Sequence, residues 1–247
     1  MQWVDYPFRQ EKIVNWRWLD RETGLVFAEY PVGNGGAANT LALRIAENQW
    51  LWISPPSRPE HQRLYEDFSS IGHPTAFLCP NPFHTLGMQP ALDAFPDADF
   101  YADRQAADRL KKKRLFSGRL QPLEDLQKRL PDHITLSLPP MKRPEVLTRV
   151  RLRDGWAWFV VDILTNLESL PENPLLRLLL KVLGFRAGPS VNRFGCKVVM
   201  GGGEEFRDWW LRELKECPPT LWLPGHGEVL DDEEWLKQLP QMFEKVL

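Results

Sequence analysis

Hydrophobic and polar positions alternate along much of the chain in short runs, the period-two pattern that predicts β-strands with one buried face. Asp154-Gly155 lies between two such runs and is a strong signal for a β-hairpin. The run that ends at Cys79 is apolar throughout and predicts a fully buried strand. The pattern predicts strands at residues 39–45, 49–53, 76–79, 99–102, 134–138, 146–152, 156–162 and 220–223, preceded by antiparallel strands within residues 1–30.

Runs with apolar residues at helical spacing are fewer than the strand-like runs. Residues 58–71 and 104–115 predict surface helices, and Asp103 is a suitable amino-terminal cap for the second. Residues 174–183 are almost wholly apolar, and we expect this helix to be buried in the core; a lid over a site or an interface is the alternative. Further helices are predicted at residues 204–216 and around Trp235.

The length and composition favour a single α/β domain. A chain of 247 residues that is 43% hydrophobic can bury a large core. We expect one domain over residues 1–247, with a helical insertion at about 168–203 where the strand pattern is interrupted.

The charge and the cysteines exclude several classes of function. A formal net charge of -2 gives no general attraction to nucleic acid or to an anionic membrane. Three well-separated cysteines without CxxC spacing suggest a reducing compartment, and the charged amino terminus has no signal-peptide pattern. We therefore expect a cytoplasmic protein with neither a nucleic-acid nor a membrane partner.

Three predicted strands end in polar loops. Cys79 is followed by Asn81 and His84, Asp162 ends the strand at 156–162, and His226 lies between two glycines after the last strand. Open α/β folds place their sites at the carboxyl edge of the sheet. A carboxylate at the end of a buried strand is costly without a partner, so we expect Asp162 either to bind a metal or to accept hydrogen bonds from loop amides.

These features resemble the metallo-β-lactamase superfamily. The resemblance lies in the NPFHTLG loop with FPDADFYA after it, the VVDILTNL strand, the PLLRLLLKVLGF helix and the LPGHG turn, and it covers residues 25–235. More narrowly, these motifs resemble a branch of unknown function with a degenerate metal motif. The resemblance implies a four-layer αβ/βα sandwich, similar to glyoxalase II, with two mixed sheets and outer helices. It also implies that His84, Asp162 and His226 are metal positions.

The family pattern is only partly matched. The family has His-x-His-x-Asp-His after one strand, and matching His84 to the last histidine puts Cys79, Asn81 and Phe83 at the other three positions. No histidine is found near Met141, where the family has its middle one. The resemblance thus implies that the first of two metal positions is lost, and that Phe83 replaces the carboxylate that orients water.

Several functions are compatible with this pattern. The favoured one is a fold member that is reduced or inactive as a dinuclear hydrolase. One alternative is a mononuclear hydrolase of an ester, thioester or phosphoester, with zinc, iron or manganese on His84, Asp162 and His226, and with Cys79 and Asn81 as nearby candidates.

Two further alternatives need no metal. A non-catalytic binding or scaffold protein would use the segment 171–190 as an interface, with a homo-oligomer as one form. A cysteine enzyme would pair Cys79 with His84 and would require a lowered thiol pKa. An enzyme of either kind would take a small-molecule substrate.

Overall fold

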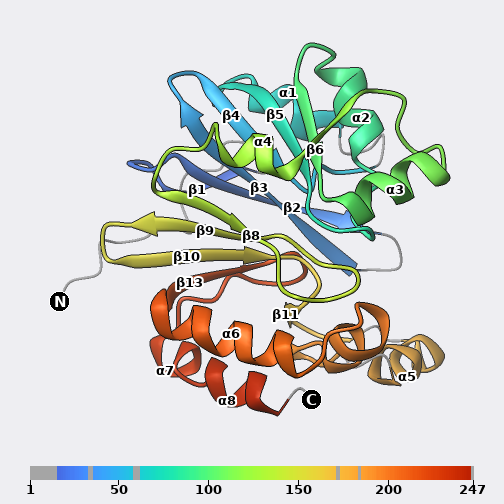
Figure 1. Cartoon of the computed structure of the whole chain (residues 1–247), viewed down its shortest axis with the longest axis vertical. Helices are drawn as coiled ribbons and strands as arrows, with labels where there is room; N and C mark the ends of the chain where they lie inside the picture. Colours follow the sequence, from blue (N-terminus) through green and yellow to red (C-terminus); the bar gives the residue numbers. More distant parts are fainter. Residues whose placement is uncertain (1–15, 33–35, 58–61, 171–172, 183–184, 246–247) are drawn as a thin grey trace.

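The computed structural model describes residues 16–32, 36–57, 62–170, 173–182 and 185–245. Two mixed β-sheets stack face to face, and helices cover both outer faces (Figure 1). The predicted four-layer sandwich is therefore confirmed. The main strands are β1 (Trp16–Asp20), β2 (Leu25–Val32), β3 (Gly36–Ala46), β4 (Gln49–Ile53), β5 (His73–Cys79), β6 (Asp99–Ala102), β7 (Leu120–Pro122), β8 (Ile134–Ser137), β9 (Leu147–Leu152), β10 (Gly155–Val160) and β13 (Pro219–Pro224).

The first sheet has seven strands in the order β1-β2-β3-β4-β5-β6-β7. Its first four strands are antiparallel, whereas β4 to β7 are parallel. The parallel strands therefore end at one edge of the sheet, and the loop that carries His84 leaves from that edge.

The second sheet has the order β13-β10-β9-β8. The predicted hairpin is confirmed, since Gly155 pairs with Leu152 across the turn and has a φ of 142°. Strand β13 runs parallel to β10, so both strands end on the same side. The loops with Asp162 and His226 leave from these two ends.

Alternating side chains build three cores. Leu51 and Ile53 of β4 point between the sheets, whereas Trp50 and Trp52 pack under the outer helices. Below the second sheet, Trp158 and Trp222 contact Trp210 of a helix on the other outer face. The described helices are α1 (Gln62–Phe68), α2 (Met88–Ala94), α3 (Arg104–Lys112), α4 (Leu123–Gln127), α5 (Pro174–Val182), α6 (Glu204–Glu216), α7 (Glu233–Leu236) and α8 (Leu239–Glu244).

Several local predictions are confirmed. Helix α6 has its predicted bounds, and the side chain of Asp103 caps α3 by accepting hydrogen bonds from the backbone of Gln105 and Ala106. The amino-terminal strand prediction lies partly outside the described residues, which begin at Trp16.

The expected burial of the apolar helix was wrong. Helix α5 lies at the surface, and Leu175, Leu178, Leu179 and Val182 are 77%, 60%, 52% and 63% exposed. Arg177 and Lys181, four residues apart, mark one polar face of the helix, but the sequence pattern does not show whether another element covers the apolar remainder. Like every other helix in the described ranges, it is unable to cross a membrane. The homo-oligomer through residues 171–190 stays a prediction.

The insertion also contains strands that the sequence pattern does not show. Strands β11 (Leu164–Leu167) and β12 (Gly188–Val191) pair antiparallel as a small separate sheet, and a short π-helical segment, Gly195–Val199, follows. Each strand has only four residues, and about twenty residues separate them, so no local turn signal links them.

Trp210 and Leu178 test this account of the cores. Trp210→Ala should lower the free energy of unfolding by about 3–5 kcal/mol, because the indole is fully buried and stacks on Phe243 with ring centroids 4.7 Å apart. Leu178→Ala should change it by less than about 0.5 kcal/mol, because that side chain faces solvent. Urea unfolding measures both, and a loss at Leu178 as large as at Trp210 would show that α5 is packed.

Candidate metal centre

The structure brings together the three residues that the sequence singles out. His84 follows β5 of the first sheet, while Asp162 and His226 follow β10 and β13 of the second sheet. Their ligand atoms all lie within 4.8 Å of one another. The centre therefore forms where the strand ends of the two sheets meet.

The spacing of the three side chains suits a shared metal ion better than a direct ion pair. Oδ1 of Asp162 lies 3.4 Å from Nε2 of His84 and 3.5 Å from Nε2 of His226. Direct charge-assisted hydrogen bonds are shorter, at about 2.7–2.9 Å. Ligand atoms around a tetrahedral ion are about 3.3–3.6 Å apart when each is 2.0–2.2 Å from the metal. Both spacings from Oδ1 of Asp162 thus suit a shared divalent ion.

The second ring nitrogen of each histidine is also engaged. Nδ1 of His226 lies 3.0 Å from the carbonyl oxygen of Ala37, which only accepts, so this nitrogen carries the proton. Nδ1 of His84 lies 2.9 Å from the hydroxyl of Ser54. In the neutral rings this arrangement leaves Nε2 of His226 with a free lone pair toward Asp162, as metal ligation requires.

The turn that carries His226 is held by Asn39 of β3. The Asn39 side-chain amide donates to the carbonyls of Pro224 and Gly227 at 2.8 and 2.6 Å. A Cβ on Gly225 would lie 2.2 Å from Val161, and Gly227 has a φ of 92°. The glycines on both sides of His226 are therefore required by close backbone approach.

Asp162 is held from its other side by Asn81. The amide nitrogen Nδ2 of Asn81 donates to Oδ2 of Asp162 at 2.7 Å and to Oε2 of Glu145 at 2.9 Å. Its oxygen accepts from the backbone of Phe83 and His84, at 2.7 and 2.9 Å. Asn81 thus connects the His84 loop to Asp162, and only Oδ1 of Asp162 is left to face the imidazoles.

Glu145 is a site residue that sequence reasoning missed. It is fully buried, and it also accepts from the backbone N–H groups of Val161 and Asp162, at 2.6 and 2.7 Å. Burial and the nearby Asp162 charge raise the pKa of Glu145 to about 8, and the hydrogen-bond donors oppose this shift. Its one sequence signal is a carboxylate directly before the apolar pair Val146-Leu147.

The imidazoles keep Asp162 ionised. Burial alone would raise the pKa of Asp162, but His84 and His226 together hold that pKa well below its ordinary value. Burial would likewise lower the pKa of His226, but the hydrogen bond and charge of Asp162 raise it above the ordinary value. A charged carboxylate between two imidazoles is a favourable set of donors for a cation.

Cys79 does not have the properties of a nucleophile. The thiol is fully buried and lies 3.3 Å from the carbonyl oxygens of Asn81 and His84. Burial raises the pKa of Cys79, which is the opposite of what the cysteine-enzyme hypothesis requires. Cys79 instead stabilises the loop that presents His84.

Two further positions that departed from the family pattern, Phe83 and Met141, supply no metal ligand. The Phe83 ring packs under the guanidinium of Arg109, 5.6 Å from its centroid. Met141 pairs with Gly202 as an isolated β-bridge. No carboxylate stands at residue 83, so this loop offers no acid beside His84.

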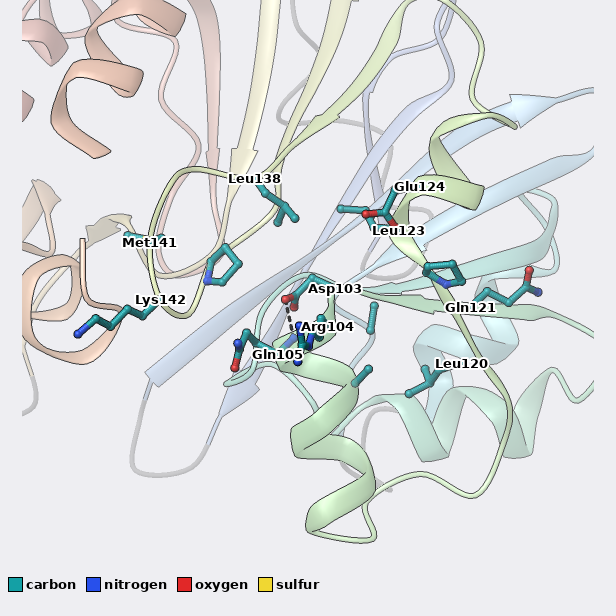
Figure 2. A pocket seen from close by; sticks show the side chains of 14 residues that line it. Asp103, Arg104, Gln105, Leu120, Gln121, Leu123, Glu124, Leu138, Met141 and Lys142 are labelled. Atoms are coloured by element: carbon teal, nitrogen blue, oxygen red, sulfur yellow. Dashed lines mark hydrogen bonds between the residues drawn. The ribbon is translucent and has the colours of Figure 1, made fainter. Parts of the chain in front are cut away.

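Two cavities lie near this end of the molecule. A small one of about 140 Å³ adjoins the centre and is lined by His84, His226, Ser54, Tyr30 and Leu86, among others. A larger one of about 540 Å³ lies between the start of α3, strand β7 and the loop 138–144 (Figure 2). The larger cavity is lined by none of the three ligands, so the smaller one is the candidate substrate pocket.

Solved structures match the whole architecture. The DIM-1 metallo-β-lactamase has a TM-score of 0.60 at 12% identity, with 91% of this chain and 94% of that chain covered. This chain has the metallo-β-lactamase fold. The FIM-1 metallo-β-lactamase from Pseudomonas aeruginosa, in its mono-zinc form, has a TM-score of 0.53 at 12% identity, with 90% of each chain covered.

The fold is shared beyond the β-lactamases. A metal-soaked flavodiiron core from Synechocystis sp. has a TM-score of 0.56 at 12% identity, with 89% of this chain and 58% of that chain covered. No family model and no curated protein matches the sequence. Since all these identities are low, the likeness establishes the metallo-β-lactamase fold and leaves the chemistry to the site.

Asn81 should be more important for stability than a surface asparagine. Asn81→Ala should lower the free energy of unfolding by about 3 kcal/mol, because it removes a donor to Glu145 and to Asp162 and leaves two loop N–H groups without an acceptor. Asn166→Ala, which removes one surface bond to the carbonyl of Glu228, should cost less than about 1 kcal/mol. Urea unfolding measures both, and equal losses would contradict a central role for Asn81.

Proposed function

We propose that this protein is a mononuclear metal-dependent hydrolase, with one divalent ion held by His84, Asp162 and His226. The observation that carries this proposal is the spacing of 3.4 and 3.5 Å between one carboxylate oxygen and two imidazole nitrogens. Two imidazoles and one carboxylate suit zinc, iron or manganese and leave coordination positions open.

The contacts of Asp162 favour one ion rather than two. Its second oxygen accepts from Asn81, and the same amide reaches Glu145. A second ion beside Asp162 would have to displace a buried amide that makes four hydrogen bonds. We infer that Asn81 and Glu145 replace the other half of a dinuclear centre, so the dinuclear activity of the fold is lost. The mono-zinc form of FIM-1 supports the idea that this fold holds a single zinc.

The substrate class follows from the site and its cavity. A bound ion of this kind supplies Lewis acidity and lowers the pKa of water. The chain contributes the apolar surfaces of Phe83 and Leu86, which line the adjacent cavity. These side chains would bind the apolar part of a small substrate and place its ester, thioester or phosphoester group at the ion.

A second candidate is a non-catalytic binding protein. Phe83 provides no carboxylate to orient water, and α5 exposes four large apolar side chains. Exposed apolar surface of this kind marks interaction sites in many proteins. In this alternative, α5 and the segment 171–190 form an interface, including one with a second copy of the chain.

Metal analysis separates the two candidates. Protein purified without a histidine tag should contain one equivalent of zinc, iron or manganese, and His84→Ala and His226→Ala should each lose it because two ligands do not hold a divalent ion tightly. His73→Ala is the matched control: this exposed histidine lies at the opposite end of β5 and should leave the metal content unchanged.

Activity is the second part of the same test. The metal-containing protein should hydrolyse members of a panel of small esters, thioesters and phosphoesters, and a chelator should abolish turnover and lower the melting temperature. Protein that takes up no metal, keeps its melting temperature in chelator and hydrolyses nothing would contradict the hydrolase and favour the binding protein.

A further inference from the structure

Ser54 has a backbone conformation that the sequence does not favour. It directly follows β4 and has a φ of 57°, a left-handed value that residues other than glycine rarely adopt. Pro55 comes next, and a residue before proline prefers extended backbone. Residues held in such conformations gather at functional sites.

Neighbouring segments hold the turn that contains Ser54. A Cβ on Gly87 would lie 1.7 Å from the carbonyl oxygen of Pro55, so the loop after His84 packs directly on this turn. The hydroxyl of Tyr65 donates to the carbonyl of Pro56 at 2.7 Å. The backbone of Ser54 itself donates to Leu78 of β5 at 3.1 Å. The turn is therefore fixed relative to the strand that presents His84.

The Ser54 side chain belongs to a buried chain of hydrogen bonds. Ser54 is 1% exposed, and its Oγ lies 2.9 Å from Nδ1 of His84. The hydroxyl of Tyr30 hydrogen-bonds to Ser54, and burial raises the pKa of Tyr30 to about 12, so this hydroxyl stays neutral. The chain continues through the ring of His84 to Nε2, which faces Asp162.

We propose that Ser54 is a positioning residue for His84, whose ring it holds with Nε2 directed at the metal centre. This inference rests on the proposed function, since the direction of Nε2 matters only if it ligates an ion. Rotation of the ring about its Cβ–Cγ bond exchanges Nε2 with a carbon that binds no metal. With Nε2 as a ligand, Nδ1 carries the proton, and Oγ of Ser54 accepts it.

Two substitutions of Ser54 separate the effect of its hydroxyl on zinc affinity from the effect of its strained backbone on stability. Ser54→Gly removes both, so the metal-free protein should melt at an equal or higher temperature while its zinc affinity falls about 10- to 100-fold. Ser54→Ala keeps the unfavourable backbone conformation, and its zinc affinity should fall by the same factor as that of Ser54→Gly. The zinc affinity of Tyr30→Phe should fall by a smaller factor. A merely structural role for Ser54 would lower stability and leave zinc affinity unchanged.

The control variant is Ser57→Ala. Ser57 lines the same cavity, but the second nitrogens of His84 and His226 bond to Ser54 and Ala37 instead. Its zinc affinity, measured by competition with a chelator, should equal that of the unmodified protein. Equal affinities for Ser54→Gly and the unmodified protein would overturn the proposal and leave the metal site intact.

A second measurement works without metal. Neutron diffraction from crystals of the metal-free proteins, which distinguishes ring nitrogen from ring carbon, should show one orientation of the His84 ring in the unmodified chain and two in Ser54→Gly. If the unmodified protein binds no zinc but the ring of the variant still loses its single orientation, Ser54 orients the ring, and the hydrolase proposal fails together with the metal-binding purpose of that orientation. Covalent labelling of Ser54 by a fluorophosphonate probe would overturn the proposal by making Ser54 a nucleophile.

Discussion

The side-chain amide of Asn81 is the interaction on which the site depends. It links two buried carboxylates, Asp162 and Glu145, and its oxygen binds the backbone of the loop that carries His84. Even with this donor in place, burial and the charge of Asp162 raise the pKa of Glu145 to about 8, whereas the two imidazoles keep Asp162 charged. The amide occupies Oδ2 of Asp162 and leaves the other oxygen of this carboxylate to the two imidazoles.

The rest of the fold serves to bring this cluster together. The sandwich packs the parallel end of one sheet against β10 and β13 of the other, so that loops far apart in sequence meet at one edge. Asn39 joins the same two sheets a second time by holding the turn around His226. The shared core between the sheets and these two asparagines fix the same geometry, which makes the spacing of the ligands a property of the whole domain.

Much of this arrangement can be predicted from sequence, and the reasons for the failures are physical. His84, Asp162 and His226 each follow a hydrophobic run, so strand ends and loop chemistry identify them. Glu145 precedes a hydrophobic run rather than following one, and its partners come from distant segments, so the single acid before Val146 does not identify it. Helix α2 begins at Met88 and has Pro90 in its first turn, where proline is tolerated but hides the helix from pattern analysis. The exposure of α5 depends on which elements pack beside it, and its own sequence, apolar outside the face of Arg177 and Lys181, does not specify those neighbours.

Anomalous X-ray diffraction from crystals grown with zinc tests the central claim most directly. The account predicts one strong anomalous peak, about 2.0–2.2 Å from Nε2 of His84, Oδ1 of Asp162 and Nε2 of His226, with the Asn81 amide still bonded to Asp162. Two peaks, a peak that displaces Asn81, or no peak at the three ligands would contradict it.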